Sequence, residues 1–218
     1  MTITMASNIK IVFSFLFAAL LWFAIFLQFY ISIPDYIANG RTTGGAIVQL
    51  FSYFTIQTNL ILAVLLTVTL LFPGSWMGRY LSLPHVSAAM AVYITIVGLV
   101  YHFMLRNQFH PVGMFKVTSD IFHIVSPIAY VFFWLLLNKK ELLKWSYIFL
   151  WLLYPLIYTI YILIRGAFSN YYPYNFIDVG QFGYAQVSIN CLFLLFGFVV
   201  LNVIFVGISR VFSHRQKV

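Results

Sequence analysis

Hydrophobic residues form six continuous runs along the chain, at residues 11–33, 47–72, 87–105, 121–137, 147–164 and 185–208. Each run is near or above the roughly 17–20 residues that an α-helix needs to cross a hydrocarbon core about 30 Å thick. Apolar and polar residues do not alternate within the runs, as they would in the strands of a membrane β-barrel. The pattern predicts an all-α, polytopic integral membrane protein with six transmembrane helices. The connecting segments are short, so we expect residues 1–218 to form one domain.

Composition agrees with this class. Of the 218 residues, 63% are hydrophobic and only 7% are charged, and the mean hydropathy is +0.97. A soluble domain of this size would not stay dispersed with so few charges. The formal net charge is +8, but the basic residues lie near the ends of the predicted helices. Membrane topology explains that placement, and we expect no nucleic-acid partner.

Basic residues are distributed unequally between the two sides of the predicted membrane. The amino-terminal side carries Lys10, Arg79, Lys139, Lys140, Lys144, Arg210, Arg215 and Lys217. The opposite side carries Arg41, Arg106, Lys116 and Arg165, together with Asp35, Asp120 and Asp178. Because cytoplasmic loops are enriched in Lys and Arg, both termini are predicted to be cytoplasmic. We expect the protein in a bacterial inner membrane.

The second run contains a cluster of polar side chains in the stretch FSYFTIQTNL, residues 51–60. Thr55, Thr58 and Asn59 are spaced i, i+3, i+4, so they share one face of a helix, whereas Gln57 points elsewhere. Hydrocarbon offers no hydrogen bonds to an amide or hydroxyl group, so this face should meet the bundle interior or a wet cavity.

The predicted topology places polar residues of five helices in the outer half of the membrane. Thr55 should lie about 12 Å along the second helix, and His123 just inside the outer end of the fourth. The other helices contribute Tyr101, His102, Arg165, Gln186, Ser188 and Asn190. We therefore expect a polar cavity that opens outward.

Several of these residues also have a purely structural interpretation. A threonine in a membrane helix commonly donates to its own i−4 carbonyl, and Asn59 and Asn190 could bond neighbouring helices. Arg165 could anchor a helix end at the membrane surface. Asp120 could hold the imidazole of His123 in one tautomer, or could complement the helix dipole in the first turn.

A nucleophilic site is chemically consistent with this pattern. A threonine hydroxyl is a poor nucleophile unless a base takes its proton, and a neutral imidazole at the same depth can do so. Thr55 and His123 are therefore the candidate nucleophile and base. Asn59, Gln57 or Tyr101 could donate hydrogen bonds to the developing oxyanion.

A zinc site is a weaker alternative. The residues that could ligate zinc at the outer face are His102, His110, Asp120, His123 and Asp178. They lack the spacing of known zinc motifs, so we expect neither a metal nor a cofactor.

Three stretches resemble a known family. They are FSYFTIQTNLILA at residues 51–63, SDIFHIVSPIAY at 119–130 and YPLIYTIYILIRGAFSNYYPYNFIDV at 154–179. Together they resemble the bacterial six-helix Pr6Pr family membrane proteins and, more distantly, the eukaryotic androgen-induced protein family. Members of the eukaryotic family are threonine hydrolases that cleave fatty acid esters of hydroxy fatty acids (FAHFA) with an intramembrane Thr and His.

The resemblance implies roles for particular residues. The family's Tyr-x-Thr stretch matches Tyr53-Phe54-Thr55, which implies that Thr55 is the nucleophile. Its His before a Pro matches His123, with Pro127 downstream, although the interval here is one residue shorter. The family's Asn follows its Thr by three residues, whereas Asn59 follows Thr55 by four, so Thr58 is an alternative nucleophile.

The leading hypothesis is a lipid-ester hydrolase in which Thr55 and His123 are catalytic. Its expected partners are membrane lipids and a lipid-like ester substrate. The predicted substrate-binding residues are Asn59, Gln57, Thr58, Tyr101, His102, Arg165 and Asn190. The alternative is a non-enzymatic membrane protein that binds or transports a lipid or small anionic ligand through the same polar groups.

Overall fold

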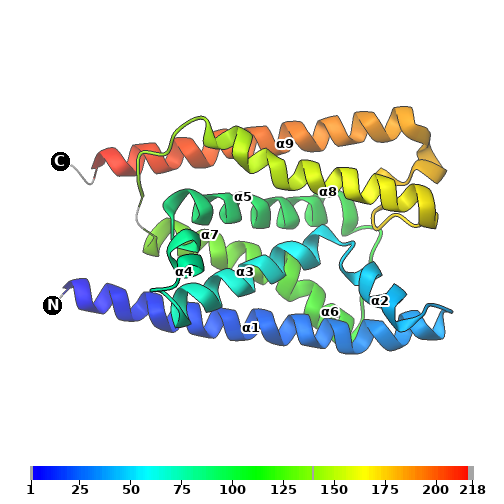
Figure 1. Ribbon diagram of the computed structural model, residues 1–218, viewed down its shortest axis with the longest axis horizontal. Helices are drawn as coiled ribbons and strands as arrows, with labels where there is room; N and C mark the ends of the chain where they lie inside the picture. The colour runs from blue at the N-terminus through cyan, green and yellow to red at the C-terminus, as the bar shows by residue number, and fades with distance from the viewer. Residues whose placement is uncertain (1, 139, 216–218) are drawn as a thin grey trace. The chain divides into compact units, whose positions relative to one another are not determined.

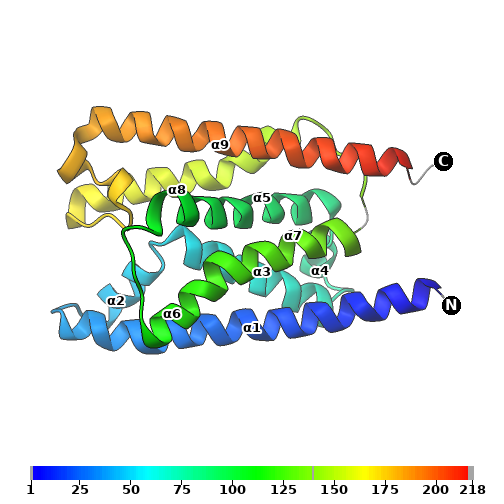
Figure 2. The ribbon, with the colours of Figure 1, turned by 180° about the vertical axis from the view of Figure 1, so that it is seen from behind.

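The computed structural model describes residues 2–138 and 140–215, and side chains within 8–138 and 140–213 (Figures 1 and 2). All regular elements of this described part are helical. Six helices are long and apolar enough to cross a membrane: Asn8–Ala38, Phe54–Leu71, Pro84–Leu105, Gly113–Leu137, Tyr147–Ser169 and Val179–Ser213. The all-helical class and the six apolar spans predicted from the sequence are confirmed.

The helices fall into two compact units, Met1–Lys139 and Lys140–Val218. The first contains α1 (Thr2–Ala38), α2 (Thr43–Leu50), α3 (Phe54–Leu71), α4 (Trp76–Leu81), α5 (Pro84–Val100), α6 (Gly113–Asp120) and α7 (Ser126–Leu137). It also contains two π-helical turns, η1 (Tyr101–Leu105) after α5 and η2 (Ile121–Val125) between α6 and α7. The second unit contains α8 (Tyr147–Ser169), the 3₁₀ turn η3 (Asn175–Ile177) and α9 (Val179–Arg215).

In the first unit α1 packs along α3, and α5 packs against α7. Buried side chains from these helices form an apolar core that includes Leu21, Leu62 and Ile94. A few polar bonds link the helices within this core. Trp22 Nε1 on α1 donates to Thr67 Oγ1 on α3 at 3.0 Å, and Thr118 on α6 donates to the Gln28 side-chain carbonyl on α1.

In the second unit α8 packs against α9, and side chains of α9 hold the segments at both ends of the pair. Asn190 Nδ2 donates to the Phe176 carbonyl at 2.7 Å. Ser209 Oγ and Arg210 Nη1 donate to the carbonyls of Glu141 and Leu143, respectively.

Three basic residues that the topology prediction used are not covered. Lys139 and Lys217 lie outside the described residues, as does the side chain of Arg215.

The predicted second span, residues 47–72, is wrong at its start because it is divided between two helices. The Ser52 hydroxyl donates to the Val48 carbonyl at 2.7 Å, the acceptor that the Ser52 N–H would use in a continuing α-helix. The helix breaks there, Tyr53 is extended (φ −85°, ψ 124°), and α3 begins at Phe54. Thr55 therefore lies in the first turn of α3 rather than about 12 Å along a helix.

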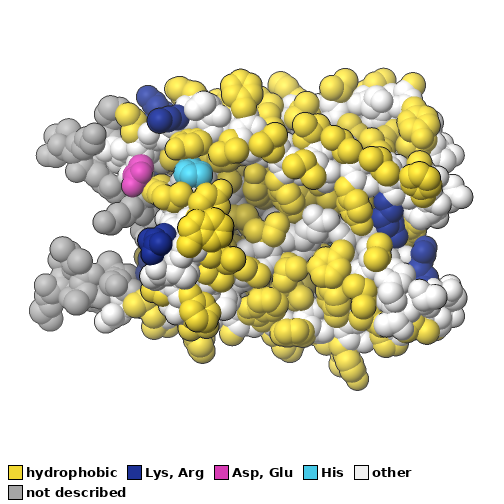
Figure 3. Space-filling view, viewed as in Figure 1, with side chains coloured by type: hydrophobic (Ala, Val, Ile, Leu, Met, Phe, Trp, Pro, Cys, Tyr) yellow, Lys and Arg dark blue, Asp and Glu magenta, His cyan; other side chains and the backbone are white. Residues whose placement is uncertain are grey.

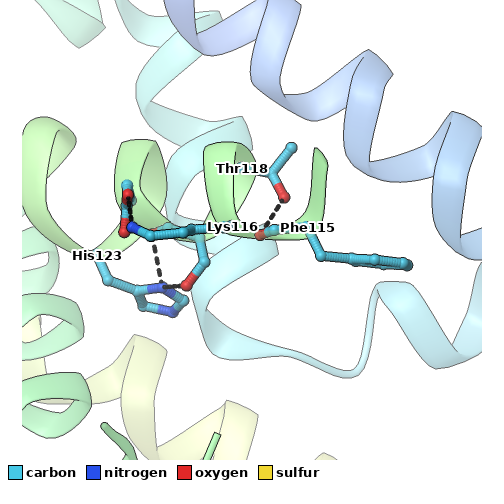
Figure 4. Close-up of polar contacts among 6 residues, drawn as sticks. Phe115, Lys116, Thr118 and His123 are labelled. Carbon is cyan, nitrogen blue, oxygen red and sulfur yellow. Dashed lines mark hydrogen bonds and ion pairs between the residues drawn. The ribbon is translucent and has the colours of Figure 1, made fainter. Parts of the chain in front are cut away.

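The predicted fourth span, 121–137, also begins too late. The helical span runs from Gly113 to Leu137, so His123 lies about 15 Å along it at 1.5 Å per residue. Lys116 and Asp120 interrupt the hydrophobic run, but they are spaced i, i+4 and form an ion pair of 2.5 Å on the helix surface (Figure 4). Paired in this way, two charges extend the helix instead of ending it.

The helices expose large apolar side chains, as membrane helices do. Phe103, Leu136 and Phe168 are 83%, 76% and 88% exposed, respectively. Figure 3 shows hydrophobic side chains over most of one face, with Lys and Arg near its ends. Such a surface would associate in water but is suited to acyl chains.

Close packing in the second unit generates a stability prediction. A Cβ added at Gly166 in α8 would lie inside contact distance of the Tyr172 ring, whereas one at Gly197 in α9 would meet no heavy atom within 4 Å. We expect Gly166→Ala to destabilise the protein by about 1–3 kcal/mol through overpacking. Gly197→Ala, the matched control, should be neutral or slightly stabilising. Thermal unfolding in detergent measures both, and equal melting temperatures would contradict the packing.

Candidate active site

Thr55 and His123 are 68 positions apart in the sequence and meet in the first unit. Thr55 on α3 is 7% exposed, and His123 lies half-buried in the π turn η2. Thr55 Oγ1 is 3.4 Å from His123 Nε2. This distance is longer than a fully formed catalytic hydrogen bond, but such bonds commonly tighten only when substrate is bound. The structure thus brings together the two residues that the sequence predicts to be nucleophile and base.

The other nitrogen of the imidazole is held by the preceding helical turn. His123 Nδ1 lies 2.9 Å from the Ser119 carbonyl oxygen and 3.2 Å from Ser119 Oγ (Figure 4). A carbonyl can only accept a hydrogen bond, so this contact requires the proton on Nδ1. Nε2 then carries the lone pair, and it is Nε2 that faces the Thr55 hydroxyl. This is the tautomer that a general base needs.

Ser119 is a member of the site that the sequence argument missed. The sequence left two roles open for Asp120, either to orient His123 or to complement the helix dipole, and the structure pairs Asp120 with Lys116 at the surface. The Ser119 carbonyl takes the orienting role. Every residue has a main-chain carbonyl, so the sequence cannot indicate which carbonyl will orient the imidazole. The Ser119 side chain, four residues before His123, could have been noticed.

An aromatic ring fixes the plane of the imidazole. The ring of Tyr101 stacks on that of His123, with centroids 4.2 Å apart and an interplanar angle of 12°. Tyr101 lies in η1 and His123 in η2, so the two π turns face each other. Close approach of α5 and α7 permits this, since a Cβ at Gly98 would lie 3.1 Å from Pro127 Cβ. π-Helical turns occur frequently at functional sites.

Proline gives a physical reason for one of these turns. Pro127 lacks an N–H and would clash with the carbonyl four residues earlier in a regular α-helix. The helix widens instead, and the Ser126 N–H bonds the Ile121 carbonyl in the i→i−5 pattern. Pro127 within an apolar run was thus a signal for η2. No proline stands at the corresponding position after η1, where residue 107 is Asn.

The polar residues after Thr55 are deeply buried. Thr58 and Asn59 are both 0% exposed, as expected for members of one inward helix face. Asn59 Nδ2 donates to the Thr55 carbonyl at 2.9 Å, while Asn59 Oδ1 has no hydrogen-bond partner among the described residues. Gln57 is half-buried and donates to the Phe51 carbonyl at 2.6 Å. Each of these amides therefore already donates one bond to the main chain.

His102 lies next to the site but is oriented differently. Its side chain is exposed, and Nδ1 lies 3.0 Å from the Gly98 carbonyl oxygen. The His102 ring meets the Tyr101 ring edge-on, with centroids 5.6 Å apart. Within the part of the chain that the structure describes, no three His, Cys, Asp or Glu residues gather as a metal site would require.

Arg165 and Asn190 belong to the second unit and contact the segment at residues 170–178. Arg165 Nη1 is 3.4 Å from the Tyr171 carbonyl oxygen, and its guanidinium lies over the Tyr171 ring at 5.1 Å. Asn190 donates to the Phe176 carbonyl and accepts from Gln186 Nε2 at 3.0 Å. These contacts are structural, and the predicted substrate-binding roles of the two residues stay predictions.

No model of a known protein family matches the chain, and no solved structure matches it. The chain is 27% identical over 148 residues to an uncharacterized protein of Mycoplasma genitalium, an alignment that covers 64% of this chain. It spans about half (55%) of that relative's length.

The ring stack generates a prediction about the exposure of His123. Tyr101→Ala removes the face that covers the imidazole, and we expect diethylpyrocarbonate to modify His123 about tenfold faster. Tyr101→Phe keeps the stacked ring and should react at the rate of the unaltered protein. Peptide mass spectrometry measures the modification at His123. Equal rates in the two variants would show that the ring does not shield the imidazole.

Proposed function

We propose that the protein is an intramembrane hydrolase of lipid esters, with Thr55 as the nucleophile and His123 as the general base. The observation that carries the proposal is the hydroxyl–imidazole contact of 3.4 Å, with the far side of the imidazole held by the Ser119 carbonyl. Nucleophile, base and orienting acceptor in this order form the arrangement that activates a hydroxyl in unrelated hydrolases.

The proposed reaction begins when Thr55 Oγ1 attacks the ester carbonyl carbon and its proton passes to His123 Nε2. The tetrahedral intermediate collapses, the bond to the alcohol oxygen breaks, and the imidazolium returns the proton to that oxygen. The alcohol leaves an acyl-threonine, which water hydrolyses with His123 again acting as base. Tyr101, Gln57 and Asn59 are the candidate oxyanion donors. No step needs a cofactor.

The apolar surroundings of the site support a lipid substrate. Thr55 lies in an apolar span, and the neighbouring helices expose Phe and Leu side chains of the kind that acyl chains contact. The resemblance to the Pr6Pr and androgen-induced protein families favours the same substrate class. A long-chain ester of the FAHFA kind is therefore the proposed substrate.

We also propose that both termini are cytoplasmic and that the protein resides in a bacterial inner membrane. The excess of Lys and Arg on the amino-terminal side of the six spans supports this orientation.

A fluorophosphonate probe tests the nucleophile. Intact-mass analysis of detergent-purified protein should show one adduct, which Thr55→Ala abolishes and His123→Ala slows by about 10²–10⁴-fold, the usual contribution of a general base. Thr69→Ala is the matched control on α3, because its hydroxyl only bonds the main chain, at the Leu65 and Leu66 carbonyls. That variant should label normally. Loss of the adduct in Thr58→Ala instead would move the nucleophile to Thr58.

A non-enzymatic binding protein is the second candidate. One observation favours it: Arg165 is half-buried, and its guanidinium contacts the main-chain carbonyl and the ring of Tyr171, which carry no charge. The Arg165 charge is thus available to a lipid or small anion. This function predicts saturable binding without an adduct, weakened more by Arg165→Gln than by Thr55→Ala.

A further inference from the structure

Two fully buried polar atoms close to Thr55 and His123 lack hydrogen-bond partners in the described part of the chain. They are Asn59 Oδ1 and Ser126 Oγ, and both residues are 0% exposed. A buried amide or hydroxyl oxygen without a partner costs about 1–3 kcal/mol by protein mutational data. Such groups in native proteins are commonly satisfied by an internal water.

Both residues follow the Thr55–His123 pair by about one helical turn along their own helices. Asn59 is four residues after Thr55 on α3, and Ser126 is three residues after His123, where η2 passes into α7. Figures 1 and 2 show that α3 and the span Gly113–Leu137 run in the same general direction. Each group is therefore displaced about 5 Å along its helix from the contact, at 1.5 Å per residue.

Pro127 adds a third polar atom at this level. A main-chain N–H at position 127 would donate to the Phe122 carbonyl in the i→i−5 pattern of η2, or to the His123 carbonyl in an α-helix. Pro127 has no N–H to give in either pattern, so a carbonyl of the turn that holds His123 loses its main-chain donor. Waters insert into helical ladders at such points.

We propose that Asn59, Ser126 and this carbonyl bind a water molecule, and that this water hydrolyses the acyl-threonine. The inference rests on the proposed hydrolase function. The donors and acceptors match: the water donates to Asn59 Oδ1 and to the carbonyl, and accepts from the Ser126 hydroxyl. Three hydrogen bonds are typical of an internal water.

The second half-reaction then has a defined source of water. The water leaves this site for the acyl carbonyl, and His123 Nε2 takes one of its protons as its oxygen attacks the carbon. The bond between the acyl carbon and Thr55 Oγ1 breaks, and His123 returns the proton to that oxygen. The products are the free fatty acid and the unmodified threonine.

The lifetime of the acyl-threonine tests the proposal. The full chain in detergent is mixed with p-nitrophenyl octanoate, release of p-nitrophenol gives the rate of acylation, and quenched intact-mass analysis gives the acylated fraction. Ser126→Ala should acylate at the normal rate but deacylate about tenfold more slowly, as expected for the loss of one hydrogen bond of about 1.4 kcal/mol. The octanoyl adduct should therefore accumulate.

Ser87→Ala is the matched control, because Ser87 is also a buried serine on a membrane span but donates to the Pro84 carbonyl. It should deacylate normally. Normal deacylation in Ser126→Ala would overturn the water site. Absence of any octanoyl adduct at Thr55 during turnover of the unaltered protein would instead overturn the hydrolase function itself.

Discussion

Hydrocarbon cannot accept or donate a hydrogen bond, and this constraint determines where the polar side chains of the protein lie. Several hydroxyl groups in the spans satisfy it locally. Thr67, Thr95 and Thr159 each donate to the carbonyl four residues earlier in their own helix. Thr55 and His123 contact each other across two helices, and here one of the two partners is an ionisable side chain. An ionisable side chain within an apolar helical span is costly to bury and commonly marks a functional site.

The same constraint explains the turn that holds the imidazole. Pro127 removes a main-chain donor, and the helix compensates by widening into the π turn η2. That turn places Nδ1 against the Ser119 carbonyl and the ring against Tyr101. Gly98 allows α5 to approach closely enough for the stack. The local irregularity of the backbone therefore determines both the tautomer and the orientation of His123.

The sequence was sufficient to predict the fold class and the pairing of Thr55 with His123, but the predicted depths of both residues along their helices were wrong. Hydrophobic runs locate six spans because each span is long, whereas the break at Ser52 depends on a single side-chain bond. The extension of the fourth span to Gly113 depends on the Lys116–Asp120 pair, which hydropathy counts as two interruptions. The two errors concern helix ends, yet the two side chains still meet at 3.4 Å. The Ser119 carbonyl could not be found from residue types at all.

The central claim is that Thr55 and His123 act as one catalytic unit, and a double-mutant comparison tests it most directly. Hydrolysis of p-nitrophenyl octanoate would be measured for Thr55→Ala, His123→Ala and the double variant. Residues that act as a unit are strongly non-additive, so the double variant should be no slower than Thr55→Ala alone. Independent effects that multiply in the double variant, or full turnover in either single variant, would contradict the account.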